Sequence, residues 1–351
     1  MKNTTESILK DVPKIIIIII FALGLLFYSQ EAASGIRDGI ALTLQTLLPS
    51  LFPFLVLSAY IVNSGALKPL AKGCSFILRF LFNLNENALP AILMGLIGGY
   101  PVGAMTTASL FRKNEINQNE AERLMLFAVN GGPAFIITAV GTGMLKNKTL
   151  GIVLFFSVAL SSLIIGIVLR FLSEGEKSKN TVDFNLFKKN AFTSAVSEAS
   201  KSIIGVAGWV LTFSCIAGLM DALGITAYYS AVLKGILEIS TGSRACAGVL
   251  PLPVLAALLS FGGIAVICQI KPYADECGVK IKKLLTFRLL CAAISAFICS
   301  QILNIFNISS DTSTIIPDKI AFSAFSTPAS VLLILMCAVF ILDVENKREK
   351  W

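Results

Sequence analysis

The sequence contains no histidine, and 14% of its 351 residues are charged, against about 25% in an average soluble protein. Without histidine the chain lacks the commonest metal ligand and the side chain that titrates nearest neutral pH. Its eight cysteines are scattered and include no CxxC pair, which gives no support for a metal site or a disulfide scaffold. Walker, HExxH and nucleophile-elbow motifs are absent too, so we predict neither an enzyme nor a cofactor.

What the chain has in abundance is apolar residues. They make up 55% of the sequence, and the mean hydropathy is +0.80. Apolar runs of about 20 residues, the length of a membrane-spanning helix, recur along the chain. We therefore predict an all-α polytopic membrane protein with about nine or ten spanning or re-entrant segments. The net charge of +8 reflects lysines and arginines in short loops, which predicts cytoplasmic termini and no nucleic-acid partner.

One long polar stretch indicates that the chain is organised in two halves. Residues 173–202 form a predicted cytoplasmic connector between transmembrane halves at 1–172 and 203–351. Two apolar segments, 74–84 and 228–247, are short or carry charges, so the sequence leaves open whether they cross or re-enter the membrane. We expect the halves to be related by an inverted repeat, as in many transporters.

Four apolar runs are interrupted by glycine or proline, which are poor residues for the middle of a helix. The first interruption, 98–104, has the sequence GGYPVGA and lies in the run 88–111, which we predict to be a single broken span. In hydrocarbon such a break is tolerated only where it is buried in protein or lines a wet cavity. Breaks in both halves therefore predict a transporter's substrate site. The other three lie at 130–133, 240–243 and 260–263.

Glu238 is the candidate ionisable residue beside one of these breaks. Charged groups at membrane depth are costly and usually face a bundle interior or a wet cavity. Lys234 lies four residues earlier, which predicts that the two side chains share a helical face. One interpretation is a site for a substrate or a coupling ion. The alternative is an internal Lys–Glu pair that only holds a helix in place.

Exposed half-helix N-termini carry partial positive charge and suit an anionic ligand, to which Lys234 and Arg244 would add full charges. At the first break Tyr100 would supply a ring and a hydroxyl, although small residues there also permit close helix packing alone. Asn130 would supply an amide, or merely cap a half-helix. The predicted substrate-binding residues are Gly98, Gly99, Tyr100, Pro101, Gly103, Asn130, Gly132, Pro133, Glu238, Ser240, Thr241, Gly242, Arg244, Gly262 and Gly263.

Four strings together resemble the YlbJ family of sporulation integral membrane proteins, also called stage V sporulation protein SpoVV. They are GGYPVGA at 98–104, EAERL at 120–124, NGGPAFI at 130–136 and EISTG at 238–242. The family belongs to a wider group with nucleoside-recognition, or gate, domains. The resemblance, which covers nearly the whole chain, implies a transporter that moves dipicolinic acid from the mother cell across the outer forespore membrane of an endospore-forming Firmicute.

The resemblance also implies the partners: a lipid bilayer, a small anionic substrate such as dipicolinate with or without Ca²⁺, and a homo-oligomer. Two other classes of function remain open. A nucleoside-type transporter would keep the architecture and change the ligand. A non-transporting gate or assembly protein would act in sporulation through protein contacts alone.

Overall fold

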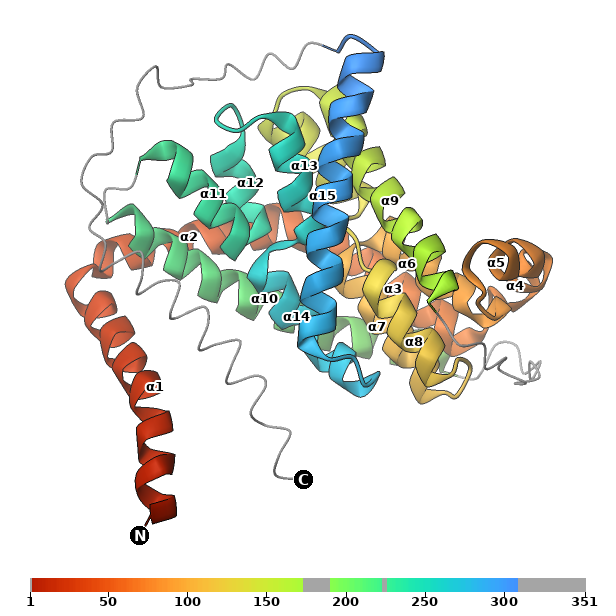
Figure 1. Cartoon of the computed structure of the whole chain (residues 1–351), viewed down its shortest axis with the longest axis horizontal. Helices are drawn as coiled ribbons and strands as arrows, with labels where there is room; N and C mark the ends of the chain where they lie inside the picture. Colours follow the sequence, from red (N-terminus) through yellow and green to blue (C-terminus); the bar gives the residue numbers. More distant parts are fainter. Residues whose placement is uncertain (1, 173–189, 223–225, 309–351) are drawn as a thin grey trace.

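The structure, a computed structural model, describes residues 2–172, 190–222 and 226–308, and all its regular elements in these ranges are helices (Figure 1). The predicted all-α polytopic fold is confirmed. Within the described residues, five helical stretches are long and apolar enough to cross a membrane: Ser29–Ser64, Lys148–Phe171, Ala191–Asp221, Leu252–Glu276 and Ile281–Ile305. The end of the predicted second half, 309–351, lies outside the described residues.

The chain begins with α1 (Lys2–Phe27), which stands away from the body of the molecule (Figure 1). A 36-residue helical stretch follows, made of α2 (Ser29–Leu42), the π-helix η1 (Thr43–Leu47) and α3 (Leu48–Ser64). The segment 74–84 contains α5 (Ser75–Phe82), whose eight residues alone are too short to cross a membrane. Together with Glu86–Gly98, from which it is bent by 87°, it is long and apolar enough for a broken span or a re-entrant loop. The short elements around it are α4 (Lys68–Gly73) and the 3₁₀-helix η2 (Glu86–Ala88).

The run 88–111 is a helical hairpin, not the single broken span that we predicted. Its arms are α6 (Leu89–Gly98) and α7 (Tyr100–Arg112). Gly95 and Gly103 would lie about 12 Å apart in a straight helix, yet a Cβ atom added to Gly103 would lie 2.8 Å from the Cα of Gly95. The chain reverses at Gly99, whose φ of 103° favours glycine.

A second broken element follows the hairpin. It consists of α8 (Gln118–Phe127) and the π-helix η3 (Ala134–Met144), joined by the non-helical residues of the 130–133 break. The uninterrupted helix α9 (Lys148–Phe171) comes next. After the undescribed part of the connector, α10 (Ala191–Asp221) runs without a break from the end of the predicted connector into the second half.

The same order of elements occurs again in the second half. A hairpin is formed by α11 (Ala227–Leu237) and α12 (Ile239–Cys246), because a Cβ atom on Gly242 would lie 2.8 Å from the carbonyl carbon of Lys234. The segment 228–247 therefore folds back and does not cross. A broken helix follows, with α13 (Leu252–Phe261) and α14 (Gly263–Glu276) meeting at Gly262, and then the uninterrupted α15 (Ile281–Ile305). Whether the halves are inverted stays a prediction.

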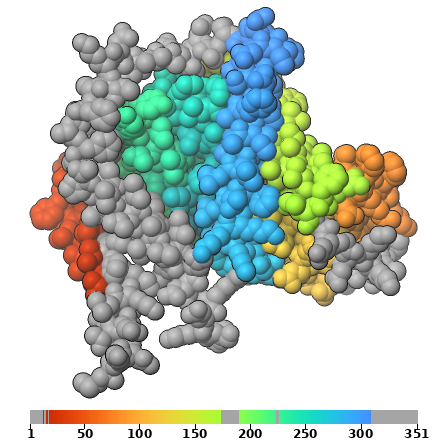
Figure 2. Space-filling view, viewed as in Figure 1, coloured from red at the N-terminus to blue at the C-terminus, as the bar shows by residue number. Residues whose placement is uncertain are grey.

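Helix α15 packs on α13 and α9, while α14 packs on α7 and joins the halves. Figure 2 shows α15 as a continuous column on one face of the molecule. Its outward side chains Leu289 and Phe297 are 61% and 65% exposed, whereas Cys291 and Cys299 are buried on its inward face. Large exposed apolar side chains suit a helix that contacts lipid.

Candidate functional site

The tips of both hairpins line one small cavity in the centre of the protein. The first hairpin contributes Gly99, Tyr100 and Pro101, and the second contributes the segment 238–240. The cavity measures about 30 Å³, which holds a water molecule but no organic anion. Its remaining walls are Leu47, Leu51, Gly132, Phe135, Val206, Val210, Val266 and Gln269. Six predicted site residues thus meet, in a closed arrangement.

Glu238 caps a helix within this site. Its backbone is extended, and its carboxylate accepts hydrogen bonds from the backbone N–H groups of Ser240 (2.9 Å) and Thr241 (2.6 Å). The Thr241 hydroxyl donates a third bond, of 2.8 Å. Glu238 is 1% exposed. Its carboxylate pairs with the free backbone N–H groups at the start of α12 and neutralises the partial positive charge of that helix end. The starts of α7 and η3, at Tyr100 and beyond Gly132, border the cavity without a carboxylate cap of this kind.

The prediction that Lys234 and Glu238 share a helical face is wrong, and the alternative of a Lys–Glu pair is wrong with it. Because α11 ends at Leu237, the two side chains do not share a helical face. The Lys234 ammonium instead lies 2.5 Å from an Asp221 carboxylate oxygen. This ion pair borders a second cavity of about 280 Å³, where Arg244 also lies. Lys234 and Arg244 are therefore absent from the lining of the central cavity, contrary to the prediction that they add charge there.

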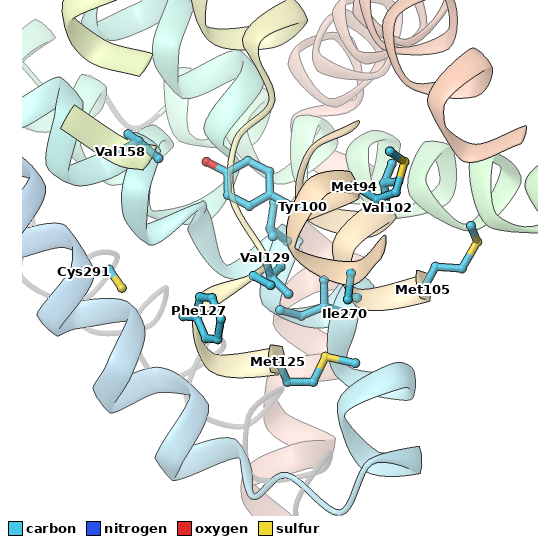
Figure 3. Packing of buried hydrophobic residues seen from close by; sticks show 14 of the residues in the cluster. Met94, Tyr100, Val102, Met105, Met125, Phe127, Val129, Val158, Ile270 and Cys291 are labelled. Atoms are coloured by element: carbon cyan, nitrogen blue, oxygen red, sulfur yellow. The ribbon is translucent and has the colours of Figure 1, made fainter. Parts of the chain in front are cut away.

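Tyr100 ties the first hairpin to the broken helix of the second half. Its hydroxyl donates a hydrogen bond to the carbonyl oxygen of Leu259, near the end of α13. Its ring packs against the break, since a Cβ atom on Gly262 would lie 3.1 Å from ring atom Cε1. Figure 3 shows the ring within the buried cluster, between the side that holds Val158 and Cys291 and the side that holds Met94 and Met105.

The other predicted residues have structural contacts and do not line the cavity. The Asn130 amide donates hydrogen bonds to the Phe127 carbonyl oxygen (2.9 Å) and the Ser162 hydroxyl (2.8 Å). Asn130 therefore holds the end of α8 to α9, and it does not cap the second half-helix, because η3 begins without a side-chain cap. Gly103 and Gly242 permit the close contact within the two hairpins. The residues absent from the lining of the central cavity are Gly98, Gly103, Asn130, Pro133, Thr241, Gly242, Arg244, Gly262 and Gly263.

Arg288 is the residue that sequence analysis missed. It lies on α15, is 1% exposed, and holds its guanidinium carbon 5.8 Å from the centre of the Tyr100 ring. Its Nη1 is 3.4 Å from the Ser260 carbonyl oxygen, while Nε and Nη2 have no hydrogen-bond partner among the described residues. One feature of the sequence could have identified Arg288. It is a charged residue within an otherwise apolar stretch, and such residues mark functional sites.

These features define an all-α membrane protein whose two helical hairpins meet at a buried central cavity. The sequence is similar to the sporulation integral membrane protein YlbJ of Bacillus subtilis (strain 168), with 25% identity over 307 residues, covering 75% of each chain. No family model and no solved structure matches the chain. The similarity supports a YlbJ-like sporulation membrane protein, in agreement with the motifs.

Proposed function

We propose that this protein is a sporulation transporter that moves a small organic anion, dipicolinate, from the mother cell across the outer forespore membrane. The observation that carries the proposal is the meeting of both hairpin tips at one buried cavity. Irregular backbone at membrane depth is tolerated where it is buried in protein or lines a wet cavity, and here it lines one. Breaks placed correspondingly in two halves are typical of transporters that work by alternating access.

The closed cavity corresponds to a ligand-free state in this scheme, because its 30 Å³ excludes the substrate. Substrate entry requires the hairpin tips to separate. The Tyr100–Leu259 hydrogen bond joins the first tip to α13 and has to break when that tip moves. The backbone N–H groups at the start of α7 would then face the anion with the partial positive charge of a helix N-terminus.

The proposal is tested in an endospore-forming host whose own copy of this gene is deleted. We expect mother cells that still synthesise dipicolinate but spores that lack it, with recovery when the gene is returned on a plasmid. A deletion strain whose spores hold normal dipicolinate overturns the proposal. Orientation is tested in the same strain, since reporter fusions at both termini should be active on the mother-cell side only.

A nucleoside-type transporter is the second candidate, and the observation in its favour is the neutral polar lining of Ser240 and Gln269. It predicts uptake of labelled uridine that other nucleosides reduce and dipicolinate does not. A gate or assembly protein without transport predicts something else. Changes at Tyr100 would then leave spore dipicolinate normal, while changes in surface loops abolish it.

A further inference from the structure

We infer that Arg288 is the carboxylate-binding residue of the transport site. This inference rests on the proposed function, and it adds the residue that would bind a carboxylate group of the substrate. The guanidinium carbon lies 5.8 Å from the centre of the Tyr100 ring, which lines the central cavity. In the proposed mechanism, displacement of this ring opens the cavity to the guanidinium.

The first argument is that the Arg288 charge is buried without a counter-charge. Burying an ion costs several kcal/mol unless it is paired and hydrogen-bonded. No described carboxylate forms an ion pair with Arg288, and its one hydrogen bond, to Ser260, is long at 3.4 Å. Arg123, which is also buried, differs because it donates hydrogen bonds to the carbonyl oxygens of Phe82 and Asn83.

The second argument comes from which nitrogens are free. Nε and Nη2 have no hydrogen-bond partner in the part of the chain that the structure describes, and these two atoms form one edge of the planar guanidinium. A carboxylate binds such an edge with two parallel N–H···O bonds, so the geometry fits this group better than it fits a neutral ligand. The ring of Tyr100, which also lines the central cavity, lies against this guanidinium.

The third argument concerns how the ligand arrives. Tyr100 follows Gly99 (φ 103°) and packs on Gly262 (φ 86°), so glycines with left-handed backbones flank the ring. Movement of the first hairpin tip carries Tyr100 with it and breaks the bond to Leu259. The same movement enlarges the cavity and uncovers the free guanidinium edge.

A purely structural role for Arg288 makes the opposite prediction. A positive charge near the C-terminal end of α13 is attracted to the partial negative charge of that helix end. In a purely structural role, Arg288 would only stabilise the break in this way. In that case its removal lowers the melting temperature of the ligand-free protein. If Arg288 instead binds the substrate, its removal takes away an unpaired buried charge and leaves the melting temperature of the ligand-free protein unchanged or raises it.

The test measures dipicolinate binding to the purified full-length protein in detergent, together with the ligand-free melting temperature. For Arg288→Gln we expect the Kd for dipicolinate to rise about 10- to 100-fold, which corresponds to the loss of a hydrogen bond between charged groups. We expect no fall in melting temperature. Arg37→Gln, an exposed arginine on α2, is the matched control and should bind as wild type does. A Gln variant with wild-type Kd, or one that loses binding and stability together, overturns the assignment.

Arg288→Lys covers the case in which the Gln variant aggregates, because it keeps the charge and loses the two-nitrogen edge. A raised Kd at wild-type stability supports the inference, and an unchanged Kd overturns it. Uridine and inorganic phosphate are parallel ligands. Wild-type protein that binds uridine and not dipicolinate overturns the transport proposal itself, whereas equal dipicolinate binding by wild type and Arg288→Gln overturns only the role of Arg288.

Discussion

The contact between the arms of the first hairpin gives a quantitative prediction. Gly103 is packed so closely that the Cβ atom of an alanine at 103 would lie 2.8 Å from the Cα of Gly95 and 2.2 Å from the carbonyl oxygen of Ala128, its nearest atom. The obstructing atoms are backbone and cannot rotate away. Overpacking of this kind costs about 1–3 kcal/mol, whereas alanine gains about 1 kcal/mol over glycine in a helix interior. We expect Gly103→Ala to destabilise the protein by up to about 2 kcal/mol net.

The assay is thermal unfolding of the purified protein in detergent, with Gly205→Ala as the matched control. A Cβ atom on Gly205, in the long helix α10, meets nothing within 4 Å. The control should therefore be as stable as the wild type or gain up to about 1 kcal/mol. The two variants are expected to move the melting temperature in opposite directions. If Gly103→Ala is as stable as Gly205→Ala, the close backbone packing of Gly103 against Gly95 and Ala128 is wrong.

Three further substitutions test other contacts by the same melting assay. Glu238→Gln should lose about 0.5–2 kcal/mol, because an amide offers one acceptor atom to the start of α12 in place of two; an unchanged melting temperature would contradict this cap. Asn130→Ala should lose about 1–3 kcal/mol with its two buried hydrogen bonds, and wild-type stability would show that they do not form. Lys234→Met should change stability by no more than about 1 kcal/mol, since its partner Asp221 is 58% exposed; a larger loss would show a buried network there.

The helical membrane fold was predictable because it depends on the length and composition of apolar runs. The positions of the breaks were predictable for a similar local reason, since glycine and proline disfavour helix continuation wherever they lie. Whether the chain continues or folds back at a break depends on contacts between residues that are not neighbours in the sequence. The run 88–111 is long enough for one membrane span and also for a hairpin with two short arms. The contact between Gly95 and Gly103 shows that it forms the hairpin.

The candidate site was predictable in part. Tyr100 and Glu238 were identified from their neighbouring breaks, and both line the cavity. The shared helical face of Lys234 and Glu238 was predicted wrongly, because the helical spacing holds only if the helix continues, and α11 ends one residue before Glu238. Arg288 was missed because its own helix has no break, and its neighbour Tyr100 is distant in the sequence.

The central claim is that this protein carries dipicolinate across a membrane, and uptake into proteoliposomes tests it most directly. Purified protein is reconstituted, and labelled dipicolinate is added with proton, sodium and calcium gradients imposed in turn. We predict saturable uptake above that of protein-free vesicles under at least one gradient, reduced by unlabelled dipicolinate and by Arg288→Gln. Uptake equal to that of protein-free vesicles under every gradient, from protein that elutes as a folded species, would contradict the claim.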